Sequence, residues 1–335
     1  MTRVALPYTC SNRVLLTGAG FTHNFGGLLA KDMWAAIFNN RRLQENTQLR
    51  KLLLDQFDFE SAYFDVMTKA EWAESDKKIL TDAVCRAYEG LDEVVCSWSF
   101  QKDATHPVND YELRKLISRF GEAGQPGFFF TLNQDLFMER MYVGNEKPMR
   151  PGVTSNPHWF KDHHHKSPLT IDDLSQLPTQ EKLEEEKGAL FTESNFFYIK
   201  LHGSHDWTDS EGNRRMVIGR DKDNQINREP LLREYLSAFK NVLCQGQCHL
   251  LVIGYGFGDN HINCIIADAA KEKDLKLYVL SPTSIADFSE SMITGNKRTI
   301  YDSLAGYFPY DLLTLFPADQ SDTPYIRNLN EQFFG

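Results

Sequence analysis

The sequence predicts an α/β fold built on a doubly wound, mostly parallel, Rossmann-like sheet. Five short apolar runs of strand length are separated by stretches with helical spacing. Four of the five runs end directly in glycine-rich or polar clusters. Continuous apolar runs are typical of parallel strands that are buried on both faces. Because ligands of open α/β sheets bind beyond the carboxyl ends of the strands, we expect these clusters to converge on one crevice.

The first predicted strand is the run Val14-Leu15-Leu16, and Gly18 and Gly20 permit a tight turn directly after it. A turn of small residues leaves backbone N–H groups uncovered, and a helix that starts there directs its positive end at an anion. The pattern therefore indicates a phosphate loop. The full dinucleotide fingerprint needs a third glycine where this chain has His23, so an ordinary dehydrogenase is disfavoured.

Two long segments interrupt the alternation of strands and helices. A helical insertion is predicted over about 31–120, where apolar residues recur at helical spacing and neither Gly nor Pro occurs between Leu28 and Tyr88. We see no catalytic spacing in it. An irregular lid or excursion is predicted over about 142–194, because this segment is polar and contains five prolines.

Of the other four strands, three deliver a polar or glycine-rich cluster and the last ends at Ser281-Pro282. The four strands are predicted at 128–132, 196–201, 249–253 and 276–280. They end, in order, at Asn133-Gln134-Asp135, His202-Gly203-Ser204, Gly254-Tyr255-Gly256-Phe257-Gly258-Asp259 and Ser281-Pro282. Helices are expected between them, one beginning at Pro230, because proline suits the first turn of a helix. The chain then divides into a domain over 1–300 and a C-terminal tail over 301–335.

Composition limits the class of partner and the compartment. Lys and Arg number 36 against 46 Asp and Glu, and the net charge of -10 argues against direct nucleic-acid binding. No apolar run approaches the roughly 20 residues of a membrane helix, and the first residues lack the apolar core of a signal peptide. We therefore expect a cytoplasmic protein with no membrane contact.

Four segments together resemble the ordered motifs of the sirtuin family. They are Thr17-Gly18-Ala19-Gly20, Thr131-Leu132-Asn133-Gln134-Asp135, Leu201-His202-Gly203-Ser204 and Gly254-Tyr255-Gly256-Phe257-Gly258-Asp259. Each is weak alone, but four in order at strand ends are specific. The sequence most resembles the bacterial sirtuin-like NAD hydrolases of anti-phage defence. The resemblance implies a catalytic domain over 1–300, with NAD as the substrate and no metal.

The resemblance also assigns roles to individual residues. It implies that Asn133 contacts the ribose next to nicotinamide, that Asp135 reads the nicotinamide amide, and that His202 is the general base. It places the remaining NAD contacts at Gly18, Ala19, Gly20, Phe21, Thr22, Gly203, Ser204, Gly254, Tyr255, Gly256 and Ser281.

The chemistry of NAD cleavage independently needs these residue types. Breaking the nicotinamide–ribose bond leaves an oxocarbenium-like sugar, as in glycoside cleavage. His202 can accept a proton near neutral pH from a ribose hydroxyl or a water molecule, and Asn133 can hold that group without adding charge. The reaction requires no metal.

Several of these residues also have plainer interpretations. Gly18 and Gly20 could merely close a turn, and a strand-end Asn or His taken alone is more often structural. His205 and Asp206 are expected to be cap or turn residues. Asp259-Asn260 is expected to cap the helix that follows, with a ribose contact from Asp259 as the alternative. His163-His164-His165 are adjacent and cannot all face one ion, so a solvated loop is predicted there.

The resemblance implies that the protein cleaves NAD to nicotinamide and ADP-ribose as the toxic effector of an abortive-infection system. It also implies a homo-oligomer, with a hexameric DNA-translocase ATPase or a short Argonaute as partner. The helical insertion and the tail are candidate assembly surfaces. One alternative is an NAD-dependent protein deacylase, but Cys244 and Cys248 lack the spacing of its zinc module. The other is a non-catalytic NAD or ADP-ribose sensor that regulates a partner.

Overall fold

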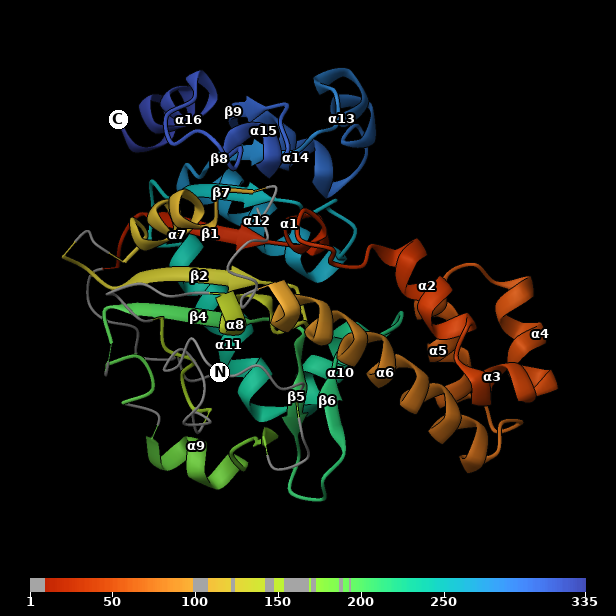
Figure 1. Ribbon diagram of the computed structural model, residues 1–335. Coiled ribbons are helices and arrows are strands. Elements are labelled where there is room, and N and C mark those ends of the chain that lie inside the picture. The colour runs from red at the N-terminus through yellow and green to blue at the C-terminus, as the bar shows by residue number, and fades with distance from the viewer. Residues whose placement is uncertain are drawn as a thin grey trace.

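The protein is described by a computed structural model that covers residues 10–98, 108–121, 124–141, 148–153, 169, 173–186, 189–192 and 194–335. Its centre is a six-stranded parallel sheet with the strand order β4-β2-β1-β7-β8-β9 (Figure 1). The strands are β1 (Arg13–Thr17), β2 (Gly127–Thr131), β4 (Phe196–Lys200), β7 (His249–Ile253), β8 (Lys276–Leu280) and β9 (Leu304–Phe308). The predicted doubly wound α/β fold is confirmed.

The strand order locates the crevice. β1 pairs with β2 on one side and with β7 on the other, so the chain builds one half of the sheet outward from β1 and the other half outward from β7. The direction of winding therefore reverses between these two strands. In open α/β sheets, ligands bind at the carboxyl ends of the strands at such a switch point.

Both faces of the sheet are covered by helices, which explains the continuous apolar runs. Leu16 and Phe130 face a core that they share with α11 (Pro230–Leu243) and α12 (Asn260–Lys273). Leu15 and Phe129 point to the opposite core. That second core is formed with α7 (Asp110–Ser118), α8 (Phe137–Met141), α15 (Leu312–Leu315) and α16 (Pro324–Leu329). Successive strand residues point to opposite faces, so every residue of these runs has an apolar environment.

The helical insertion has a hydrophobic core of its own. It consists of α2 (Ala30–Phe38), α3 (Arg41–Glu45), α4 (Thr47–Asp55), α5 (Phe59–Thr68) and α6 (Glu74–Trp98). The side chains of Asn40, Asn46 and Asp58 cap three of these helices. In Figure 1 the insertion lies to one side of the sheet, next to α1 (Ala19–His23). The sequence prediction extended the insertion to residue 120, but α7 packs on the sheet itself.

A smaller, three-stranded sheet is formed by segments that precede and follow β4 in the sequence. It contains β3 (Ser175–Gln176), β5 (Gly203–Thr208) and β6 (Arg214–Met216), and it is followed by α10 (Lys222–Arg228). Much of the predicted lid over 142–194 falls outside the described residues, as do His163-His164-His165. The described part of the lid includes α9 (Gln180–Glu186).

The residues after 300 continue the main sheet, and the predicted count of five strands was one too low. β9 pairs with β8 and follows α13 (Ile285–Ser291) and α14 (Asn296–Asp302). At Gly306 in β9 an added Cβ would lie 2.6 Å from the Tyr278 ring, so a side chain does not fit there. The glycine interrupts the apolar run of the strand, which is why the sequence pattern did not reveal it. A π-helix (Asn330–Phe334) ends the chain, and its Phe333 is buried against the sheet. Within the described part of the chain, no helix has the length and apolar character to cross a membrane.

Candidate functional site

The loops after β1 and β7 pack directly against each other at the switch point. The Gly18 N–H donates to Ile253 O at 3.1 Å, and the Gly20 N–H donates to Gly254 O at 2.9 Å. Gly254 has a φ of 68°, and a Cβ there would lie 2.1 Å from Phe21 N. A Cβ on Gly18 would lie 2.8 Å from Gly254 O. These glycines are therefore needed for contact between two backbones, which is a stricter demand than a tight turn.

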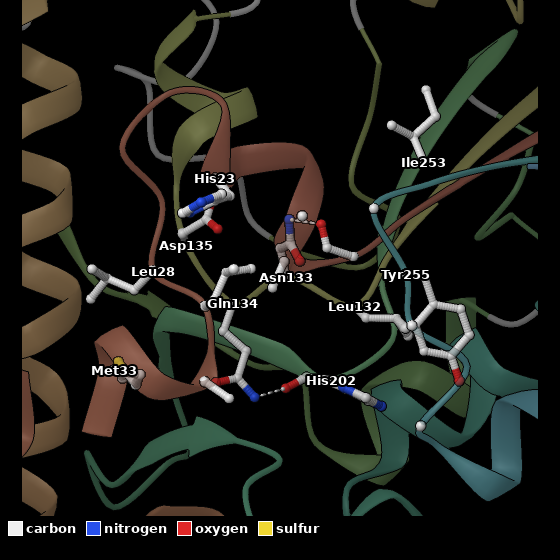
Figure 2. Close-up of a pocket in the computed structure, with 18 of the residues that line it drawn as sticks. His23, Leu28, Met33, Leu132, Asn133, Gln134, Asp135, His202, Ile253 and Tyr255 are labelled. Carbon is white, nitrogen blue, oxygen red and sulfur yellow. Dashed lines mark hydrogen bonds between the residues drawn. The ribbon is translucent and has the colours of Figure 1, made fainter. Parts of the chain in front are cut away.

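A cavity of about 800 Å³ opens beside these loops, at the carboxyl ends of the central strands. Ten of the predicted site residues are on its wall, namely Gly18, Ala19, Gly20, Asn133, Asp135, His202, Gly254, Tyr255, Gly256 and Ser281. Leu28 and Met33 lie on one side of it and Ile253 and Tyr255 on the other (Figure 2). The insertion therefore forms one wall of the cavity, a contribution that its sequence did not reveal.

Four predicted contact residues do not lie on the cavity wall. Phe21 is fully buried and packs edge-on against Phe129. The Thr22 hydroxyl donates to Asp135 Oδ2 at 3.1 Å and so supports that carboxylate from behind. Gly203 and Ser204 begin β5, and the buried Ser204 hydroxyl donates to Gln134 O at 3.3 Å. These residues support the wall from inside the protein.

Asn133 is held by the loop that follows β1. Its Nδ2 donates to Gly18 O at 3.0 Å, and its backbone N–H donates to Thr131 Oγ1 at 3.1 Å. Its Oδ1 makes no hydrogen bond to any described residue. Since Asn133 lines the cavity, this oxygen can accept a hydrogen bond from a ligand hydroxyl or a water molecule.

Asp135 lies next to a buried ion pair between Lys200 and Glu139. Its Oδ1 accepts the Phe137 N–H at 3.0 Å, which caps α8. Lys200 Nζ donates to Asp135 O and lies 2.9 Å from Glu139 Oε1, and both side chains of this pair are fully buried. Burial raises the pKa of Asp135, and the positive charge of Lys200 opposes that rise. The sequence analysis missed Lys200, although a lysine that ends a strongly apolar strand is itself a signal.

His202 is 4% exposed at the floor of the cavity. Burial lowers the pKa of its imidazole to about 3, so the ring is neutral near pH 7. Its backbone O accepts from Gln134 Nε2 at 3.2 Å (Figure 2) and from the Val217 N–H at 2.9 Å. The Gln134 side chain in turn accepts from the Tyr88 hydroxyl at 2.8 Å, so α6 of the insertion helps to fix the His202 peptide.

The His202 ring contacts His261, which lies beside a cluster of charged residues that the sequence analysis did not find. His202 Nε2 lies 2.9 Å from His261 Nε2. Asp259 is the N-cap residue of α12, but its carboxylate pairs with Lys222 at 2.7 Å and makes no cap hydrogen bond, which corrects the predicted side-chain cap. Lys222 also reaches Glu60 at 2.9 Å. Burial favours a higher pKa for Asp259, but His202 and Lys222 outweigh it and hold that pKa below its usual value.

Among the described residues, one group of side chains could also hold a metal ion. Donor atoms of His202, Asp259 and His261 all lie within 4.8 Å of one another. The Asp259 carboxylate is already paired with Lys222, and the two imidazoles are already in hydrogen-bond contact. The donor atoms that face one another in this group are therefore already engaged by protein groups.

His205 and Asp206 are not the turn or cap residues that the sequence suggested. Both are buried within β5. Asp206 lies 3.2 Å from Arg150, and the His205 ring stacks on Tyr88. Burial lowers the pKa of His205 to about 4. His23 does line the cavity, and its Nδ1 lies 2.9 Å from Gly27 O.

These features define a doubly wound α/β protein with a ligand cavity at the switch point of its sheet. The model of the SIR2-like domain family matches residues 127–298, just over half of the chain, and the protein belongs to this family. The predicted sirtuin-like resemblance is thereby confirmed at the level of the family. SIR2-like domains use NAD. No curated protein matches the sequence.

Proposed function

We propose that the protein hydrolyses NAD to nicotinamide and ADP-ribose in the cavity at the switch point. One observation carries the proposal. Asn133 and Asp135 follow β2 and His202 follows β4, yet all three lie on the wall of the cavity that the two glycine loops border. The reaction needs a polar group at the ribose and a neutral base, together with a place for the pyrophosphate, and this cavity supplies all of them.

The glycine loops would hold the pyrophosphate, because they bring bare backbone to the cavity wall. An added Cβ at Gly256 would meet no atom within 4 Å, so the space beside this backbone is open to a ligand. Ser281 follows β8 and lines the cavity beside the β7 loop, and we assign it to the adenosine half. The nicotinamide half would then lie toward Asn133 and Asp135.

Cleavage of the nicotinamide–ribose bond releases neutral nicotinamide and leaves positive charge on the ribose. A water molecule held by Asn133 Oδ1 then adds to the ribose, and His202 accepts the proton that this water loses. The products are nicotinamide, ADP-ribose and one proton. His202 is neutral at pH 7, so one of its ring nitrogens can accept a proton, and the burial that lowers its pKa to about 3 also makes it a weak base while the cavity is empty.

We further propose, from the resemblance of the motifs, that this activity is the toxic effector step of an anti-phage abortive-infection system. On the same ground the active form is a homo-oligomer, with a hexameric DNA-translocase ATPase or a short Argonaute as partner. Unregulated hydrolysis would deplete the cell of NAD, so an assembly step that switches the activity on is consistent with the chemistry.

The first experiment incubates the purified full-length protein with NAD alone and follows nicotinamide and ADP-ribose by chromatography. We expect release of nicotinamide and ADP-ribose by the protein alone or once the proposed assembly has switched it on, and we expect His202→Ala to abolish this release in either case. His249→Gln is the matched control, because His249 is the first residue of β7 and so lies at the amino ends of the strands, away from the cavity. Turnover that requires an acyl-lysine peptide would show a deacylase instead. NAD binding without turnover, also in the assembled complex, would show a sensor.

A further inference from the structure

We propose that His261 is a positioning residue that fixes the tautomer of His202, so that Nδ1 of His202 is unprotonated and accepts the proton released in NAD hydrolysis. This inference rests on the proposed function. His261 does not line the cavity, whereas His202 does. His261 therefore acts through His202 and has no contact with the substrate.

The contact between the two rings limits where their hydrogens can lie. His202 Nε2 and His261 Nε2 are 2.9 Å apart, and the ring centroids are 5.1 Å apart at an interplanar angle of 43°. Both rings are buried, at 4% and 8% exposure. A neutral imidazole has one N–H donor and one acceptor nitrogen. One of the two Nε2 atoms therefore carries a hydrogen and the other accepts it.

The surroundings of His202 indicate which ring donates. Its Nε2 is occupied by His261, and its Nδ1 makes no hydrogen bond to any described residue. Because the ring lines the cavity, Nδ1 is the nitrogen left to act on a ligand. For Nδ1 to accept a proton, the ring hydrogen must be on Nε2, which then donates to His261. His261 Nε2 is the acceptor that holds this arrangement.

The charged groups around His261 favour this assignment. Burial lowers the pKa of His261, whereas the negative charges of Asp259 and Asp223 favour its protonated form and Lys222 opposes them. When His202 Nδ1 takes a proton from water, the O–H bond breaks and an N–H bond forms. The Nε2 hydrogen can then pass to His261 Nε2. The positive charge would thereby move next to Asp259. When His202 Nδ1 then releases its proton to solvent, the shared hydrogen returns to His202 Nε2 and the starting tautomer is restored.

A hydrogen bond explains the contact better than a bridging metal does. Zn–N bonds are about 2.0–2.1 Å long, so two imidazole nitrogens on one tetrahedral zinc are separated by more than about 3 Å. The observed 2.9 Å is a hydrogen-bond distance. Lys222 also neutralises the carboxylate that a cation would need.

Two substitutions of His261 test the inference through activity. His261→Leu cannot accept a hydrogen bond, and we expect kcat to fall on the order of 10–100-fold with the KM for NAD unchanged. His261→Gln can accept through its side-chain oxygen, and it should restore kcat to within about threefold of the parent. Thermal unfolding and NAD binding of both variants show whether they are folded. Equal activity of the two variants, whether high or low, would overturn the inference.

The ring tautomer is measured separately by ¹⁵N NMR of the histidines in the absence of NAD. We expect His202 to be protonated at Nε2 in the parent protein and to become a mixture of tautomers in His261→Leu. A parent that hydrolyses NAD while His202 carries its hydrogen on Nδ1 would overturn the inference and leave the proposed function intact. A parent with the expected tautomer and no NAD turnover in any assembly would refute the function alone.

Discussion

The two ends of the cavity are built by different means. At the glycine end, the loops after β1 and β7 meet backbone to backbone, and Gly18, Gly20 and Gly254 leave no room for a Cβ. At the polar end, Asn133, Asp135 and His202 present side chains that are held by hydrogen bonds to protein groups. The glycine end is fixed by steric packing, and the polar end by buried polar partners.

This difference predicts that the glycine end binds the substrate and that the polar end carries out the chemistry. The glycine end brings bare backbone to the cavity, so it suits the pyrophosphate of the proposed substrate. The polar end contains the groups that can accept protons or hydrogen bonds. Changes at the glycine end should therefore destroy the cavity and with it all binding. Changes at the polar end should reduce the rate and leave binding largely intact.

Gly254→Ala should have the largest effect. The new Cβ would lie 2.1 Å from Phe21 N, and φ is positive, so the two loops must separate. We expect loss of NAD binding by calorimetry and a lower unfolding temperature. Gly256→Ala is the matched control, because its Cβ meets nothing within 4 Å and should leave the unfolding temperature unchanged. Equal unfolding temperatures for the two variants would contradict the packing that we describe.

Asn133→Ala tests the polar end. It removes the side chain that would hold the attacking water, and we expect kcat to fall on the order of 10²-fold or more. The KM for NAD should change little, because the glycine end is intact. Asn39→Ala, at an exposed helix end of the insertion, controls for loss of an asparagine. A variant that loses NAD binding together with kcat would show that the two ends are not separate.

Lys200→Met tests the support beneath the polar end. It leaves the buried Glu139 carboxylate without its cation and removes the hydrogen bond to Asp135 O. Breaking a buried pair from one side costs about 3–5 kcal/mol. We expect a loss of unfolding free energy of that order in denaturant titrations. Adding Glu139→Leu should recover part of the loss, and a double variant no more stable than Lys200→Met would argue against the pair.

The same contrast explains what could be predicted from the sequence. The fold was predictable because the runs over 14–16, 128–130 and 250–253 are apolar throughout and are followed closely by polar or glycine-rich clusters. Asn133 and His202 could be placed near each other because the carboxyl ends of parallel strands share one edge. β9 was missed because Gly306 and Ala305 weaken its apolar pattern.

The partners of the site residues could not be predicted, because they come from segments that meet only in three dimensions. His261 and Lys222 approach His202 and Asp259 through the packing of α10 and α12, which no local pattern specifies. Tyr88 reaches Gln134 from the middle of an amphipathic helix, where its spacing is that of any half-buried residue. Lys200 alone had a local signal, as a charge within an apolar strand.

Buried histidines at the polar end should make the protein sensitive to acid. Burial holds the pKa of His202 at about 3 and of His205 at about 4, and it also lowers the pKa of His261. In the unfolded chain a histidine titrates near pH 6.5. Below that pH the unfolded state binds more protons than the folded state, so the free energy of unfolding falls as the pH drops toward the folded-state values. We expect a lower unfolding temperature at pH 5 than at pH 7.

His205→Phe should flatten this pH dependence, and it is the smallest of the expected effects. His205 stacks on Tyr88, and an aromatic side chain keeps that packing while removing one titrating group. Burial is the main cause of the lowered pKa of His205; Asp206 favours the protonated form, and Lys200 adds to the effect of burial. Well below pH 6.5 the slope of unfolding free energy with pH should decrease by up to about 1.4 kcal/mol per pH unit. An unchanged slope would mean that His205 is protonated in the folded protein, which its complete burial in β5 argues against.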